Sequence, residues 1–253
     1  MRLLLDGDTL TYVVGYATND VTDFKLIKTI LTKKIQYICN TWGSYEYSIY
    51  LTSTKPEDNY RFELATIKPY KGNRKGEKPK WYKEIRQYLM DTHGAIIVTN
   101  GEADDELGRQ QSEGTMIVTI DKDLMQIPGR IYDFKQDRVY SSYDPGQLTL
   151  HKKVGKDGVK YTLKGVGFKW FCAQCFLGDT VDNIPGLKGY GAKKTYTYLK
   201  DLNTTDLLWA MTVAAFKEAK KLDHLREVAQ LLWIQRSNND LLTLCLGTLD
   251  ERR

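Results

Sequence analysis

Residues that build disulfide frameworks and zinc sites are scarce in this chain. Its 253 residues include four cysteines and three histidines. So few cysteines in a chain of this length argue against a disulfide scaffold. Cys172 and Cys175 form a C-x-x-C pair, but the sequence has no second pair and its histidines are isolated. We therefore interpret the pair as two small residues one turn apart on a helix, not as zinc ligands or a redox motif.

Long apolar runs are absent as well. The longest, such as AIIV and MIV, are far too short to span a bilayer. The amino-terminal MRLLLDGD carries a charge inside what would be the apolar part of a signal peptide, which favours a strand. No internal repeat, low-complexity tract or long Pro/Gly linker is present. We therefore expect a soluble, cytoplasmic monomer (in the host cytoplasm if the source is viral) with no membrane partner.

What the sequence does have is a set of eight acidic residues at the ends of apolar segments: Asp6, Glu102, Asp104, Asp105, Asp121, Asp123, Asp179 and Asp182. Helix capping explains one or two of them, but not eight that follow three separate strands. Clustered carboxylates repel one another and need divalent cations to neutralise them. Oxygen ligands without His or Cys favour Mg²⁺ or Mn²⁺. Two such ions about 4 Å apart commonly cleave phosphodiesters, so the sequence predicts a metal-dependent nuclease.

Short β-rich runs alternate with segments of helical spacing. The strand candidates are residues 2–5, 46–52, 95–100 and 115–120. Residues 23–40 and 79–93 have the apolar spacing and the Pro and Gly boundaries of helices. Alternation of this kind predicts an α/β fold with a mostly parallel central sheet flanked by helices. Residues 130–167 predict hairpins, and the chain beyond Gly167 predicts helices.

The acidic residues occupy a particular position in this fold. Asp6, Glu102 and Asp121 each come just after a predicted strand. Ligand sites of open α/β sheets lie at the carboxyl ends of their strands. Asp179 and Asp182 have the i, i+3 spacing that places both on one side of a helical turn.

Two basic segments complement the acids in a chain of net charge +5. Residues 66–86 carry eight Lys or Arg against two Glu, with aromatic residues between them. Cations next to aromatic rings suit phosphates and stacked bases, although a solvated basic helix is the usual alternative. Residues 186–194, GLKGYGAKK, have Ala192 where a nucleotide-binding loop needs Lys. Their glycines instead favour close approach of backbone amides to a duplex phosphate, with a structural helical hairpin as the alternative.

Five motifs in order resemble the flap endonuclease family, also called 5′-nucleases: LLLDGD, YKGNR, EADDE, TIDKDL and GDTVDNIPGLKGYGAKK. The resemblance extends from about Asp6 to Tyr198, and is strong to bacteriophage 5′–3′ exonucleases and the 5′-nuclease domain of bacterial DNA polymerase I. It implies 5′–3′ exonuclease and structure-specific 5′-flap endonuclease activity on DNA, with removal of RNA primers and flaps in phage DNA replication. The implied partners are 5′ flaps, 5′-ended duplexes, RNA–DNA primer junctions and replication proteins.

The resemblance also implies a layout. An α/β core over residues 1–167 would include a basic helical arch at about 60–93. A helical DNA-binding region over 168–253 would contain a helix–three-turn–helix element at about 177–200, with K⁺ bound there. The other cofactor would be Mg²⁺ or Mn²⁺, as two ions.

The implied residue roles follow the motifs. One metal would be held by an inner set of carboxylates: Glu102, Asp104, Asp105 and Asp121, with a contact from Asp6. The other would be held by Asp123, Asp179 and Asp182. Lys71 and Arg74 would act on the scissile phosphate. The DNA contacts would come from the arch and the glycine-rich loop: Tyr70, Lys75, Lys78, Lys80, Trp81, Gly186, Lys188, Gly189, Gly191, Lys193 and Lys194.

One family position departs from the pattern. The second strand of the family usually ends near a further metal-site Asp, and Ser53 stands there in this chain. Either Glu57 or Asp58 compensates, or the site has one carboxylate fewer. We interpret the nearby Asp8 as a turn residue and not as a ligand. Two other functions remain open: a PIN-like ribonuclease, which lacks the glycine-rich hairpin, and a catalytically inactive protein that binds branched DNA.

Overall fold

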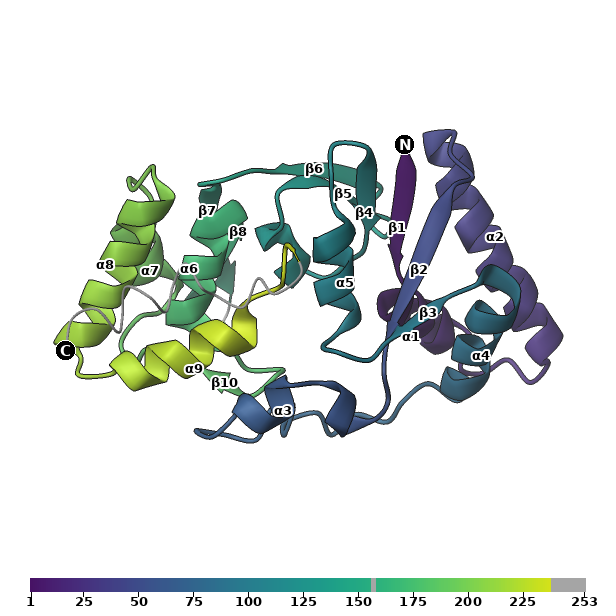
Figure 1. Ribbon diagram of the computed structural model, residues 1–253, viewed down its shortest axis with the longest axis horizontal. Coiled ribbons are helices and arrows are strands. Elements are labelled where there is room, and N and C mark those ends of the chain that lie inside the picture. The colour runs from purple at the N-terminus through teal and green to yellow at the C-terminus, as the bar shows by residue number, and fades with distance from the viewer. Residues whose placement is uncertain (156–157, 238–253) are drawn as a thin grey trace.

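The computed structural model describes residues 1–155 and 158–237. Lys156 and Asp157 of the predicted hairpin turn, Cys245 and the end of the predicted DNA-binding region lie outside the described residues. Figure 1 shows the sheet at the centre, with a group of helices at each end of the molecule. None of the described helices combines the length and apolar composition needed to cross a membrane.

A six-stranded sheet of order β3-β2-β1-β4-β5-β6 forms the centre of the fold. Its strands are β1 (Arg2–Asp6), β2 (Tyr47–Thr52), β3 (Ile96–Val98), β4 (Thr115–Val118), β5 (Gly129–Asp133) and β6 (Arg138–Ser142). The first five are parallel, and β6 pairs antiparallel with β5 at the edge. The mostly parallel α/β fold and its strands are therefore confirmed. Because β1 and β4 are adjacent and parallel, their carboxyl ends meet at one edge of the sheet.

Helices cover both faces of this sheet. One face packs against α1 (Gly7–Ala17), α2 (Phe24–Trp42) and α4 (Tyr82–His93), through a cluster that includes Leu3, Ile35 and Leu89. The other packs against α5 (Ala103–Gln110), through a cluster that includes Leu4 and Leu107. The central strands β1 and β4 are buried on both sides, which explains why they appear in the sequence as continuous apolar runs.

A second group of helices follows the sheet. It comprises α6 (Gly167–Leu177), α7 (Ala192–Leu199), α8 (Thr205–Glu218) and α9 (Leu222–Leu232). These helices share a separate hydrophobic cluster with a long hairpin of β7 (Gln147–Gly155) and β8 (Gly158–Val166). Cys172 and Cys175 are buried in that cluster, on α6. After α9 the chain returns to the sheet, where Ile234 joins the α5 cluster.

The arch and the acidic turn differ from expectation. Between α3 (Arg61–Leu64) and α4, residues 65–81 form turns and irregular backbone, so helix in this structure is confined to the two ends of the predicted arch. Its two prolines and two glycines break helical hydrogen bonding. Asp179 and Asp182 lie in a tight turn between β9 (Gly178–Asp179) and β10 (Ile184–Pro185), and not on a helical turn. Two short 3₁₀ helices, η1 (Pro56–Asp58) and η2 (Asp123–Gln126), complete the fold.

Candidate active site

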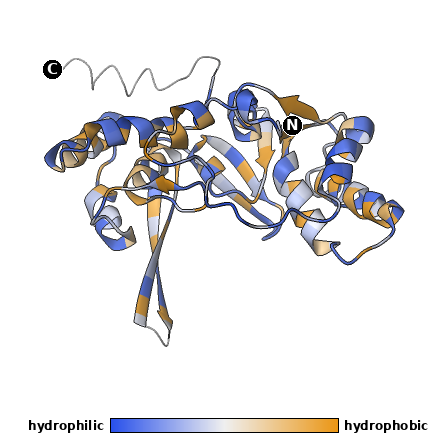
Figure 2. Cartoon of the chain, turned by 90° about the horizontal axis from the view of Figure 1, so that it is seen from below, coloured by the Kyte–Doolittle hydropathy of each residue, from blue (hydrophilic) through white to orange (hydrophobic). Residues whose placement is uncertain are grey.

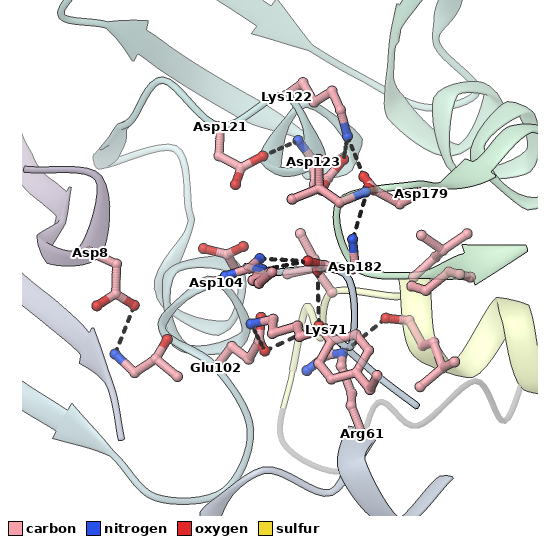
Figure 3. A pocket seen from close by; sticks show the side chains of 18 of the residues that line it. Asp8, Arg61, Lys71, Glu102, Asp104, Asp121, Lys122, Asp123, Asp179 and Asp182 are labelled. Carbon is pink, nitrogen blue, oxygen red and sulfur yellow. Dashed lines mark hydrogen bonds and ion pairs between the residues drawn. The ribbon is translucent and has the colours of Figure 1, made fainter. Parts of the chain in front are cut away.

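One pocket at the carboxyl edge of the sheet collects most of the predicted acidic residues (Figure 3). The predicted carboxylates that line it are Asp6, Glu102, Asp104, Asp121, Asp123, Asp179 and Asp182. Lys71 and Arg74 line the same pocket. The acids that follow β1, β3 and β4 meet here because these three strands all end at this edge of the sheet. The turn after α6 adds Asp179 and Asp182.

Asp6 ends β1 and begins α1. As the N-cap of the helix, its Oδ1 accepts a hydrogen bond from the amide of Thr9 at 2.9 Å. Its Oδ2 accepts a hydrogen bond from the hydroxyl of Thr119 at 2.6 Å. The side chain is 1% exposed. Burial, together with the charge of Asp8, raises the pKa of Asp6 to about 6. Asp6 therefore carries a charge that the folded protein does not fully compensate.

The three acids of EADDE have three different environments. Burial favours the neutral form of Glu102, but the charges of Lys71 and Arg61 outweigh it and hold its pKa at about 2. Asp104 faces the pocket, and burial and the charges of Asp121 and Asp6 raise its pKa well above the usual value. Glu102 is thus paired with cations, whereas Asp104 mainly faces other carboxylates.

Asp105 points away from the pocket and does not line it. It is fully buried and accepts two bonds from the guanidinium of Arg61, at 2.6 and 2.9 Å. Its Oδ2 also accepts the amide of Glu102 at 2.9 Å, which caps α5. In this structure Asp105 is therefore the counter-ion of a buried arginine and not a pocket carboxylate, contrary to the metal-site expectation.

The TIDKDL segment adds a cation that the sequence analysis did not single out. Lys122 contacts Asp123 at 2.8 Å and Asp179 at 2.6 Å. Burial and the charge of Asp121 raise the pKa of Asp123 to about 7 in spite of Lys122. Asp121 Oδ1 accepts the amide of Asp123 at 2.8 Å, which closes a tight turn and directs both carboxylates toward the pocket.

Hydrogen bonds between the loop of residues 69–74 and the β9–β10 turn form a joint that places the YKGNR motif beside the acids. The amide of Lys71 donates to the carbonyl of Asp182 at 2.9 Å, and Arg74 Nε donates to the Asp182 carboxylate at 3.0 Å. Asn183 donates to the carbonyl of Pro69 at 2.9 Å from the other side. Lys71 is held at a φ of 57°, a backbone conformation that is uncommon outside glycine. Its ammonium forms an ion pair with Glu102. This joint depends on contacts that no local sequence pattern reveals.

Lys71, Arg74 and Lys122 form ion pairs with carboxylates of the pocket. In residues 1–155 and 158–237, no three His, Cys, Asp or Glu side chains are arranged to hold one metal ion. The pocket nevertheless has the chemistry of a divalent site. Its donors are carboxylate oxygens, and Asp6, Asp104 and Asp123 have raised pKa values that a cation would relieve. A metal would take the place of Lys71 or Lys122 beside the acids.

Two aromatic residues of the basic segment are not positioned to stack on bases. Tyr70 is 6% exposed, packs edge-on against Phe62, and donates its hydroxyl to Glu102 at 3.1 Å. Trp81 is half-buried against Phe24 and donates its indole N–H to a backbone carbonyl. Each ring fills space in the protein in this structure, and base stacking by either residue stays a prediction. Lys75, Lys78 and Lys80 are exposed.

Neither of the two acids that could have compensated for Ser53 reaches the pocket. Ser53 hydrogen-bonds to Asp58, and neither Glu57 nor Asp58 lines the pocket. Asp8 does line it, held by Arg86 at 2.5 Å and by the amide of Thr52 at 3.0 Å. Asp8, which we expected to be only a turn residue, is the extra carboxylate of the pocket.

The glycine-rich loop joins α6 to α7. Lys188, Gly189, Gly191, Lys193 and Lys194 are exposed, and Gly189 has a φ of 87°. Gly186 has a packing reason to be glycine, since a Cβ there would lie 2.3 Å from the carbonyl oxygen of Phe176. Whether this loop binds DNA or K⁺ stays a prediction.

Comparisons with known proteins give a consistent picture. No protein-family profile matches the chain. It is 23% identical to flap endonuclease Xni of Shewanella halifaxensis over 242 residues, covering 90% of this chain and 89% of that protein. It is 24% identical to DNA polymerase I of Bacillus subtilis over 241 residues, but it spans only 26% of the polymerase. The chain resembles the 5′-nucleases. The T5 D15 protein, co-crystallised with metal ions, shares the fold with a TM-score of 0.61 at 16% identity, over 99% of this chain and 96% of that one.

Proposed function

We propose that this chain is a metal-dependent 5′-nuclease that cleaves DNA at 5′ flaps and 5′ ends. The observation that carries the proposal is the convergence of eight carboxylates, seven of them predicted, with Lys71 and Arg74 in one pocket. The order of these residues matches the 5′-nuclease motifs, and a relative of similar length is named a flap endonuclease. We propose in addition that the enzyme removes RNA primers and flaps during phage DNA replication.

The metal ligands divide by position in the pocket. Asp6, Glu102, Asp104 and Asp121 come from the edge of the sheet, and Asp123, Asp179 and Asp182 come from η2 and the β9–β10 turn. All donate hard oxygens, which suits two Mg²⁺ or Mn²⁺ ions. When bound, such ions activate a water for attack and stabilise the leaving oxygen. Asp105 would support this set from behind, by capping α5 and orienting Glu102.

The chain's own cations would act on the phosphate. Lys71 and Arg74 are held by the joint between their loop and the Asp182 turn, so their charges enter the pocket from one side. A phosphodiester that enters the pocket would draw the ammonium of Lys71 away from Glu102. Lys71 would then oppose the charge that develops on the phosphate oxygens, and Glu102 would be released to a metal. One residue would thereby couple substrate entry to completion of the metal site.

The test is cleavage of a duplex that carries a labelled 5′ flap, with the ends of the products mapped. We expect hydrolysis in Mg²⁺ close to the junction of flap and duplex, and much slower cleavage of the same strand without a duplex. Specific binding of the flap substrate without cleavage would instead identify an inactive binder of branched DNA. Preferential cleavage of single-stranded RNA would favour the PIN-like alternative.

A further inference from the structure

The β7–β8 hairpin forms an arm that leaves the body of the molecule, as Figure 2 shows. Its base is fixed to the helical region, where Leu148, Leu150 and Leu163 join the cluster around α6. Beyond these residues the exposed positions dominate both strands. Each strand has nine residues, so the arm is about 30 Å long.

The base of the arm is tightly held. The amide of Gly167 donates to Ser142 at 3.0 Å, and the amide of Phe168 donates to Asp144 at 2.7 Å. A Cβ on Gly146 would lie 1.8 Å from the carbonyl oxygen of Val166, so the two chain segments cross in direct contact. An arm anchored in this way presents its far half in a defined direction and does not fold back onto the protein.

The charge of the arm is of one sign. Its described residues include four lysines, Lys152, Lys153, Lys160 and Lys164, and no Asp or Glu. The strand register places Lys153 directly opposite Lys160 and Lys164 opposite Thr149. These residues share one face, because side chains alternate along a strand. Like charges that face each other across a sheet are destabilising, so the arm gains stability when an anion lies between them.

The opposite face of the arm, which carries Tyr161, lies toward the glycine-rich loop and leaves the lysine face uncovered by it. Helix α7 packs against both strands of the arm. The ammonium of Lys193 lies 5.6 Å from the ring centroid of Tyr161 on β8. Lys160 and Lys164 lie four residues apart on β8, about 13 Å, which is roughly four phosphate steps along one DNA strand. The face that carries Lys153, Lys160 and Lys164 therefore matches a phosphate backbone better than a compact acidic ligand.

We infer that the β7–β8 arm binds the phosphate backbone of the duplex part of the substrate, through Lys153, Lys160 and Lys164. The inference rests on the proposed function, because it takes DNA as the substrate. It adds a contact about 30 Å in reach that is separate from the acidic pocket. The arm would make the length of the duplex, and not the flap, a determinant of affinity.

The test is the salt dependence of duplex binding, measured by anisotropy with Ca²⁺ replacing Mg²⁺. Lys153→Ala/Lys160→Ala should lower the slope of log K against log salt by about two units, since each phosphate contact contributes roughly 0.9. Affinity should fall on the order of tenfold for a duplex of about one helical turn beyond the flap junction, and little for a shorter one. Lys25→Ala/Lys33→Ala, which removes the same charge from exposed positions of α2, is the matched control and should leave the slope unchanged.

Three results would overturn the inference. The first is a slope for the arm variant equal to that of the control. The second is an equal loss of affinity for single-stranded DNA, which would mean that the arm does not read a duplex. The third is unchanged binding by Lys153→Glu/Lys160→Glu, whose melting temperature would show that it is folded. Failure of the unmodified protein to cleave in Mg²⁺ would sink the proposed nuclease function but would leave this binding measurement valid.

Discussion

Replacing Asp105 should destabilise the fold, whereas replacing its neighbour Asp104 should not lower the stability. Asp105→Ala would strand the guanidinium of Arg61, which is 2% exposed and which Asp105 binds at 2.6 and 2.9 Å. Breaking a buried ion pair from one side costs about 3–5 kcal/mol of unfolding free energy. Each kcal/mol lowers the melting temperature of a chain of this size by about 2–4 °C, so the expected fall is about 6–20 °C.

Asp104→Ala is the matched control, because it removes the adjacent carboxylate of the same helix. Burial and the charges of Asp121 and Asp6 hold the pKa of Asp104 well above its usual value, so its removal relieves repulsion. Its melting temperature in chelator should therefore be unchanged or higher. Thermal unfolding followed by circular dichroism, without added metal, gives both values.

A double variant separates the ion pair from loss of packing. Arg61→Met/Asp105→Leu replaces the pair with apolar side chains of similar size and should recover much of the lost stability. The reasoning would be refuted if Asp105→Ala melted at the wild-type temperature and lost Mn²⁺ binding. Asp105 would then be a metal ligand, as the family resemblance implies.

Three further predictions concern the pocket. Lys71→Ala should slow single-turnover cleavage on the order of 100-fold while flap binding changes little, because its charge acts mainly on the transition state. Equal losses in cleavage rate and in flap affinity would make Lys71 a simple phosphate anchor. The pKa of Asp6, raised to about 6, means that the folded state keeps this proton after the unfolded chain has lost it. In chelator, the free energy of unfolding of wild type should therefore fall by about 2 kcal/mol relative to that of Asp6→Asn as pH rises from about 4 to about 6. A difference between the two proteins that does not change with pH would contradict this. Lys122→Met should tighten Mn²⁺ binding several-fold by calorimetry, since it removes the cation that Asp123 and Asp179 now share, whereas weaker binding would show that Lys122 orders the site.

The sheet and the position of the acids were predictable because they follow local rules. Buried parallel strands appear as apolar runs, and the carboxyl ends of such strands converge at one edge. Asp6 and Asp121 lie close together because β1 and β4 are also neighbours in the sheet, an order that the sequence did not predict. The helices of residues 23–40 and 79–93 were identified from apolar spacing for the same reason, with α4 starting a few residues later than its proline.

The partners of the acids were not predictable, because they arise from contacts between distant segments. Arg61 lies 44 positions from Asp105, and Lys122 lies 57 positions from Asp179. Tyr70 stands among lysines in the sequence, and only the folded structure shows that it is buried. The α/β boundary at residue 167 and the DNA-binding region beyond it remain predictions.

The central claim is that the acidic pocket is the divalent-metal centre of a 5′-nuclease. Its most direct test is single-turnover cleavage of a 5′-flap duplex by wild type and by Asp121→Ala, each in Mg²⁺ and then in excess EDTA. We predict cleavage by wild type in Mg²⁺ alone, with Asp121→Ala inactive but unchanged in its circular dichroism spectrum. Cleavage that persists in EDTA, or at the full rate in Asp121→Ala, would contradict the claim.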